Sequence, residues 1–148
     1  MHRRNIIMGA FTAAGALLAA ATRGRANAAD TEKPKVVYHL CDLDKVAFVL
    51  GNIRNHYEGM GGPDKVTIEL VVHGPALKAF HAASANTDVA RRFGEFSKAG
   101  LAAQACGNSM KTQNVTLKDL LPGFGIADRG GVVRIAELQA LGYAYLKP

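Results

Sequence analysis

The amino-acid sequence predicts an α/β fold with a mainly parallel sheet of about five strands and helices on both faces. Short apolar runs of strand length recur over residues 35–148. Segments with apolar residues at spacings of three and four, typical of amphipathic helices, alternate with them. Glycine- or proline-containing breaks separate the two kinds of segment. This alternation favours a parallel sheet, because parallel strands are joined by helical crossovers.

The first three predicted elements are a strand, a helix and a strand. Lys35–Cys41 is β-branched and largely apolar, as in strands buried on both faces of a parallel sheet. Leu43–Tyr57 carries apolar residues along one helical stripe, with Asp42 or Asp44 available as its cap. After a glycine-rich break, Lys65–Val72 has the pattern of a second strand.

A short and a longer helix follow, and then a third strand. Ala76–His81 predicts the short helix, and Asn86-Thr87-Asp88 caps the longer one, whose apolar residues share one face. Gly100 ends this helix. Leu101–Cys106 is alanine-rich, but its place after a helix and a glycine favours a third parallel strand.

The last part of the chain continues the alternation. Gly107–Gln113 predicts a helical turn, and Thr116 is placed to cap another helix start. Phe124–Ala127 predicts a brief strand. Val132–Leu141 has apolar residues at spacings of three, as in a packed helix, and Tyr143–Lys147 predicts the final strand.

The first 28 residues have the pattern of an export leader. Arg3-Arg4 before an apolar run is typical of a twin-arginine signal peptide, and Ala26-Asn27-Ala28 matches a cleavage motif. A polar tail, 29–34, then leads to one domain over 35–148. The alternative is an uncleaved membrane anchor, because Ile6–Ala21 approaches the ~17–25 residues of a spanning helix. The alanine-rich composition and the cleavage motif favour removal, so we expect a periplasmic protein without membrane association.

Loss of this leader changes the charge of the chain. Four of its 18 Lys and Arg residues and none of its 12 Asp and Glu residues lie in 1–28, so 14 remain against 12, a net charge of +2 instead of +6. The chain without the leader therefore lacks the strong positive charge typical of nucleic-acid-binding proteins, and we expect no nucleic-acid partner.

Cys106 is the candidate catalytic residue. It ends a predicted strand, and Gly107 and Asn108 then open a helical turn. A thiol at a helix N-terminus meets unpaired backbone N–H groups that stabilise its thiolate, and we expect this sulfur to be reachable from solvent. The competing interpretation is a buried structural cysteine.

Cys41 and His73 are predicted at the same edge of the sheet, beyond the carboxyl ends of the strands. Cys41 is a possible second thiol, although the two aspartates near it disfavour its thiolate. His73, with Gly74, is a supporting residue that can act as acid, base or hydrogen-bond donor, or simply bond to backbone. A disulfide between Cys41 and Cys106 stays open, because it requires neighbouring strands.

Other site chemistries lack a sequence signature. No dinucleotide fingerprint, phosphate-binding loop or serine-hydrolase elbow is present. The histidines and cysteines have no metal-ligand spacing, and His39, inside the first strand, is expected to be a satisfied core residue. We therefore expect neither a metal nor a cofactor.

Six segments are distributed over the whole of residues 35–148: Lys35–Leu40, Leu50–Tyr57, Ile68–Leu77, Leu101–Asn108, Thr116–Pro122 and Val132–Pro148. In this order they resemble the DsrE-like (DsrE/DsrF) family of sulfur-oxidation and sulfur-relay proteins. The resemblance implies a three-layer α/β/α sandwich and a homo-oligomer, often a trimer or hexamer. It also implies that Cys106 carries sulfur as a persulfide and passes it to a partner.

Two features depart from the family pattern: the export leader and the additional Cys41. An exported protein cannot join a cytoplasmic relay, so its donor and acceptor would be periplasmic proteins or small sulfur compounds. The leading hypothesis is a sulfur carrier using Cys106. The alternatives are an oligomeric module that binds a small ligand or partner, and a redox switch using both cysteines. We expect any oligomer to bury helix faces rather than the reactive edge.

Overall fold

The computed structural model describes residues 32–148, and its strands form one five-stranded, entirely parallel sheet in the order β4-β3-β2-β1-β5. The predicted leader, 1–28, lies outside the described residues. The strand bounds are β1 Lys35–Leu40, β2 Thr67–Val72, β3 Ala102–Cys106, β4 Phe124–Ala127 and β5 Ala144–Leu146.

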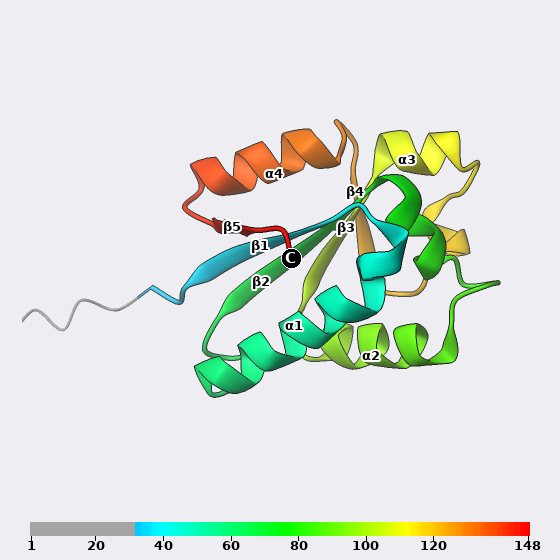
Figure 1. Ribbon diagram of the computed structural model, residues 1–148. Helices are drawn as coiled ribbons and strands as arrows, with labels where there is room; N and C mark the ends of the chain where they lie inside the picture. Colours follow the sequence, from blue (N-terminus) through cyan, green and yellow to red (C-terminus); the bar gives the residue numbers. More distant parts are fainter. Residues whose placement is uncertain (1–31) are drawn as a thin grey trace, which may run out of the picture. The chain divides into compact units, whose positions relative to one another are not determined.

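Helices cover both faces of this sheet, which confirms the predicted three-layer α/β/α sandwich. In Figure 1, α4 lies on one face, and α1 and α2 lie on the other. The α-helices are α1 Val46–Met60, α2 Thr87–Lys98, α3 Gly107–Thr112 and α4 Gly131–Ala140. None of the helices in residues 32–148 combines the length and apolarity that a bilayer crossing requires.

Three segments that the sequence predicts as helices adopt tighter 3₁₀ geometry over part or all of their length. They are η1 Leu43–Lys45, before α1; η2 Gly74–Phe80, after β2; and η3 Leu117–Asp119. Short connectors commonly take this form, because a few residues cannot complete a cooperative α-helix. The predicted caps Asn86 and Thr116 are confirmed: the Asn86 side chain accepts the Asp88 N–H, and Thr116 forms a capping box with Asp119.

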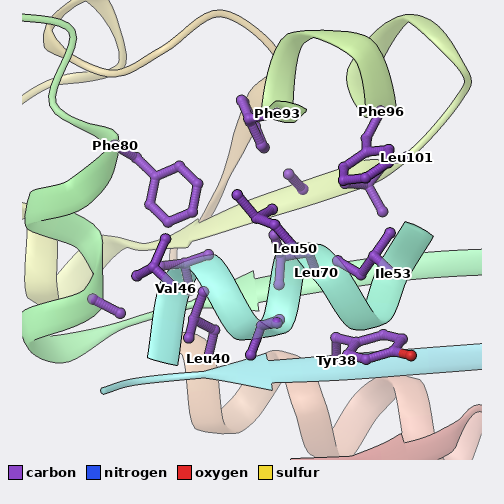
Figure 2. Packing of buried hydrophobic residues seen from close by; sticks show 14 of the residues in the cluster. Tyr38, Leu40, Val46, Leu50, Ile53, Leu70, Phe80, Phe93, Phe96 and Leu101 are labelled. Carbon is purple, nitrogen blue, oxygen red and sulfur yellow. The ribbon is translucent and has the colours of Figure 1, made fainter. Parts of the chain in front are cut away.

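Most of the core lies between the sheet and helices α1 and α2. Figure 2 shows Leu50 and Ile53 of α1 among side chains of β1 and β2. Because successive strand residues point to opposite faces, Tyr38 and Leu40 enter this core, whereas Val37 joins a smaller cluster under α4. The α4 face is therefore the thinner layer, and the polar residues of the strands gather on it.

A buried ion pair fixes α4 to the sheet. Glu69 of β2, 4% exposed, is the one buried charged side chain among the described residues. Arg134 of α4 donates to it through Nε at 2.7 Å and through Nη2 at 2.9 Å. Such a two-bond fork sets the orientation of the helix as well as its position.

Candidate functional site

The predicted convergence of Cys41, His73 and Cys106 at one sheet edge is confirmed. Leu40 pairs with Val72, and Val72 pairs with Ala105. The next position along the chain is therefore Cys41 directly after β1, His73 directly after β2 and Cys106 at the end of β3. All three side chains point to the α4 face. His73 stands between the two cysteines.

Cys106, the last residue of β3, lies where two helices begin. It is the N-cap residue of α3, and Gly131 opens α4 beside it. Burial, the largest single effect, raises the pKa of the Cys106 thiol. Hydrogen bonds from the Ser109 hydroxyl and from the backbone N–H groups of Ser109, Gly131 and Asn108 outweigh it, so the pKa lies below its usual value.

The exposure of Cys106 differs from the sequence-based expectation. Its side chain was expected to be reachable from solvent, but the residue is only 5% exposed. The cause is the close approach of α4: a Cβ on Gly131 would lie 3.3 Å from the Cβ atoms of both Cys106 and His73. The same approach that brings the Gly131 N–H to the sulfur therefore also covers it.

Ser109 connects Cys106 to the end of β2, and sequence reasoning did not assign it a role. Its hydroxyl donates to the Cys106 sulfur and accepts the Gly74 N–H at 2.7 Å. The Gly74 carbonyl in turn accepts Nε2 of Gln113 at 2.8 Å. Gly74 holds a φ of +58°, which favours glycine and turns its amide toward α3.

Gly107 and Asn108, the other predicted supporting residues, act mainly through their backbones. A Cβ on Gly107 would lie 3.2 Å from the Ala127 carbonyl oxygen, so glycine permits α3 to start against the end of β4. The Asn108 N–H is one of the donors to Cys106, while the residue itself is exposed.

Cys41 has the opposite electrostatic environment to Cys106. Burial first, and then the hydrogen bond and negative charge of Asp42, raise the pKa of the Cys41 thiol; Lys147 opposes them. The predicted unfavourable effect of Asp42 is thus confirmed. Cys41 is half-buried, so the more accessible cysteine is the less acidic one.

The disulfide-switch hypothesis does not fit the strand order. β2 lies between β1 and β3, so the two cysteines are separated by two strand spacings, about 9–10 Å, whereas a disulfide needs Cα atoms within about 7 Å. Both cysteines are free thiols.

His39 is not the core residue that the sequence predicted. It is half-buried on the α4 face, and its Nε2 lies 2.5 Å from Nε2 of His73. Its Nδ1 bonds to the Tyr145 hydroxyl at 2.7 Å. Burial, the first cause for both imidazoles, lowers the pKa of His39 and of His73. The two-residue alternation of Val37, His39 and Cys41 was the available sign that His39 faces away from the main core.

A pocket of about 750 Å³ lies beside the Cys106 environment. Gly74, Asn108 and Ser109 line it, together with Lys78 and Gln113. The pocket therefore shares two residues with the hydrogen-bond shell of Cys106, although Cys106 itself does not line it.

Comparison with known proteins gives a family and a fold. The DsrE/DsrF-like family model matches residues 11–148. The comparison with curated proteins found no match.

Three solved structures share the fold. The protein of unknown function MTH1491 from Methanobacterium thermoautotrophicum is 25% identical with a TM-score of 0.69, over 78% of this chain and 100% of its own. The ychN protein from E. coli is 9% identical with a TM-score of 0.55, over 77% and 99%. The conserved protein of unknown function BT1422 from Bacteroides thetaiotaomicron is 17% identical with a TM-score of 0.56, over 77% and 95%.

Proposed function

The chain belongs to the DsrE/DsrF-like family, and from this premise we propose that it is a periplasmic sulfur-handling protein in which Cys106 carries sulfur as a persulfide. One observation carries the proposal: the Cys106 sulfur lies at the starts of two helices, where the Ser109 hydroxyl and backbone N–H groups lower the pKa of its thiol. These donors stabilise a thiolate, which is the form that attacks sulfur. They would stabilise a terminal persulfide anion by the same interaction.

The loading step is a nucleophilic displacement without a cofactor. The Cys106 thiolate attacks the outer sulfur of a donor such as thiosulfate, and a new S–S bond forms while the S–S bond of the donor breaks. Sulfite leaves with the bonding electron pair, and the charge is conserved. An acceptor thiolate then attacks the outer persulfide sulfur, which regenerates the Cys106 thiolate.

The low exposure of Cys106 favours a small sulfur compound as the donor. At 5% exposure the side chain offers little surface to the thiol of a folded protein. Asn108 and Ser109 both bond to Cys106 and line the adjacent pocket, so a small anion in that pocket would need to pass only this shell. The twin-arginine pattern at Arg3-Arg4 supports loading and unloading outside the cytoplasm.

Mass spectrometry of the intact protein tests persulfide formation. Reduced protein is treated with thiosulfate or with polysulfide, and the mass of the native chain is compared with those of Cys106→Ser and Cys41→Ser. We expect added sulfur atoms in the native chain and in Cys41→Ser, and none in Cys106→Ser. Addition that follows Cys41, or no addition from either donor, would refute the carrier role.

A second candidate function is a small-ligand or partner-binding module in which Cys106 is structural. The burial of Cys106 and the neighbouring 750 Å³ pocket favour it. Thiol labelling of the native, reduced protein separates the two functions. A carrier requires Cys106 to react with a small reagent at neutral pH, whereas a structural cysteine reacts only after unfolding.

We also propose that the protein is a homo-oligomer, a trimer or hexamer, that buries helix faces. Val132 of α4 and Leu141, directly after α4, support this assembly, because they are 68% and 62% exposed, which is unfavourable for apolar side chains left in water. Light scattering after size-exclusion chromatography measures the subunit number. A monomer at micromolar concentration would contradict this proposal.

A further inference from the structure

Three potential metal ligands converge on the α4 face, beside the Cys106 environment. His39 lies in β1, Cys41 directly follows β1 and His73 directly follows β2. Their donor atoms, two imidazole nitrogens and one sulfur, all lie within 4.8 Å of one another, and each residue is half-buried. We propose that these residues form a binding site for a thiophilic late transition-metal ion, Zn(II) or Cu(I).

The donor set defines the class of metal. Imidazole nitrogen and thiolate sulfur are borderline and soft ligands, which bind zinc and copper well. Calcium and magnesium require oxygen ligands and are excluded by the same argument. Three protein ligands satisfy Cu(I) in trigonal geometry, whereas Zn(II) would take a fourth ligand such as water.

The distances fit such an ion after a small adjustment. In a tetrahedral zinc site with Zn–N bonds of about 2.05 Å, two nitrogens lie about 3.3 Å apart. The Nε2 atoms of His39 and His73 are 2.5 Å apart, so they need to separate by about 0.8 Å. Their ring centroids are 4.7 Å apart and their planes meet at 22°, so the two Nε2 atoms face each other from adjacent strands, and both rings must turn to direct their lone pairs at one ion.

An outer contact orients one of the ligands. The Tyr145 hydroxyl of β5 bonds to Nδ1 of His39 at 2.7 Å, which leaves Nε2 as the nitrogen that faces His73 and Cys41. Metal-bound histidines usually have such a partner on the second ring nitrogen, because it fixes the ring and the tautomer. Tyr145 is therefore a positioning residue in this site.

Charged groups near the site balance one another. Asp42 and Lys147 act with opposite signs on both imidazoles and on the Cys41 thiol. When a metal ion binds, it would displace the Cys41 proton, so the ligand set would then be two neutral imidazoles and one thiolate. Cys106 is not part of this ligand set, so metal binding and persulfide formation can succeed or fail independently.

Titration with Co(II), Zn(II) and Cu(I) tests the site on the reduced full domain. Co(II) gives a sulfur-to-metal charge-transfer band in the near ultraviolet when a cysteine thiolate binds it. Competition with chromophoric chelators measures affinity for Zn(II) and for Cu(I) separately. We expect one ion per chain, and a Co(II) band that is lost in Cys41→Ser and retained in Cys106→Ser.

Histidine variants distinguish this site from adventitious surface binding. His39→Gln and His73→Gln should each abolish stoichiometric binding, whereas His56→Gln, outside the cluster on α1, should retain it. Tyr145→Phe should weaken affinity by roughly 10- to 100-fold. Thermal unfolding checks that each variant folds, and the bound ion should raise the melting temperature of the native chain but not of His73→Gln.

Three outcomes would overturn the proposal. The first is that none of the three ions binds above the level seen with the His39→Gln/His73→Gln double variant. The second is a Co(II) band that depends on Cys106 and not on Cys41. The third is stoichiometric binding that survives both histidine substitutions; in that case the short imidazole contact is an ordinary hydrogen bond.

Discussion

Ser109→Ala should raise the pKa of the Cys106 thiol, because it removes the one side-chain donor to that sulfur. A hydrogen bond to a charged group contributes ~1.5–3 kcal/mol. At 1.36 kcal/mol per pKa unit, the shift is about 1–2 units upward. The three backbone donors from Ser109, Gly131 and Asn108 remain in the variant, so part of the depression persists.

The assay is the rate of Cys106 alkylation by a small reagent as a function of pH, measured in a Cys41→Ser background. The midpoint of this profile reports the pKa. At pH values below both midpoints, the upward pKa shift lowers the fraction of Cys106 that is thiolate. A more basic thiolate is also intrinsically more nucleophilic, with a Brønsted coefficient of about 0.4–0.5, which offsets part of this loss. The two effects together slow alkylation by Ser109→Ala about 3- to 15-fold.

Thr112→Ala is the matched control, because Thr112 also lies in α3 but its hydroxyl donates to the Asn108 carbonyl instead of to sulfur. It should leave the midpoint unchanged. Ser109→Ala also removes the acceptor of the Gly74 N–H, so urea denaturation must show that the variant is folded under the assay conditions. A folded Ser109→Ala protein with the native midpoint would refute the assigned role of the hydroxyl.

Three further predictions follow from packing and electrostatics. Arg134→Ala leaves buried Glu69 without its counter-ion and should lower the free energy of unfolding, measured in urea, by ~3 kcal/mol. The double variant Glu69→Leu/Arg134→Met should recover most of the lost stability, and native stability in Arg134→Ala would disprove the role of the ion pair. Gly131→Ala should push α4 from Cys106, lower the free energy of unfolding by ~1–3 kcal/mol and, because the Gly131 N–H moves from the sulfur, raise the midpoint of the Cys106 alkylation profile; an unchanged midpoint would contradict this. The alkylation midpoint of Cys41 should lie above that of Cys106, because the pKa of the Cys41 thiol is raised and that of the Cys106 thiol is lowered, and the reverse order would show that the two environments are misassigned.

The local part of this architecture was predictable from the sequence. Every predicted strand is present within two residues at each end, including the alanine-rich β3. The Asn86 and Thr116 caps formed as expected. These features depend on residues a few positions apart, so a linear pattern contains them.

The residues predicted at the site do lie together, but their environment was only partly predictable from the sequence. Cys106 was recognised because a strand, a cysteine and a helix start are consecutive in the chain. Its donors Ser109 and Gly131 lie three and 25 positions further along, and only the packing of α4 on the sheet brings the Gly131 N–H to the sulfur. The same packing buries Cys106, contrary to the expectation of an accessible thiol.

The sequence by itself determined the alternation of strands and helices and the place of each cysteine at a strand end. Tertiary structure alone decided that β2 separates the cysteines, and that His39 meets His73, 34 positions away. Periodicity assigns a side chain to a face of its own strand, but strand order and register determine which side chains of other strands share that face. Strand order and register depend on the crossover connections and on packing between distant segments, so no local sequence pattern contains them.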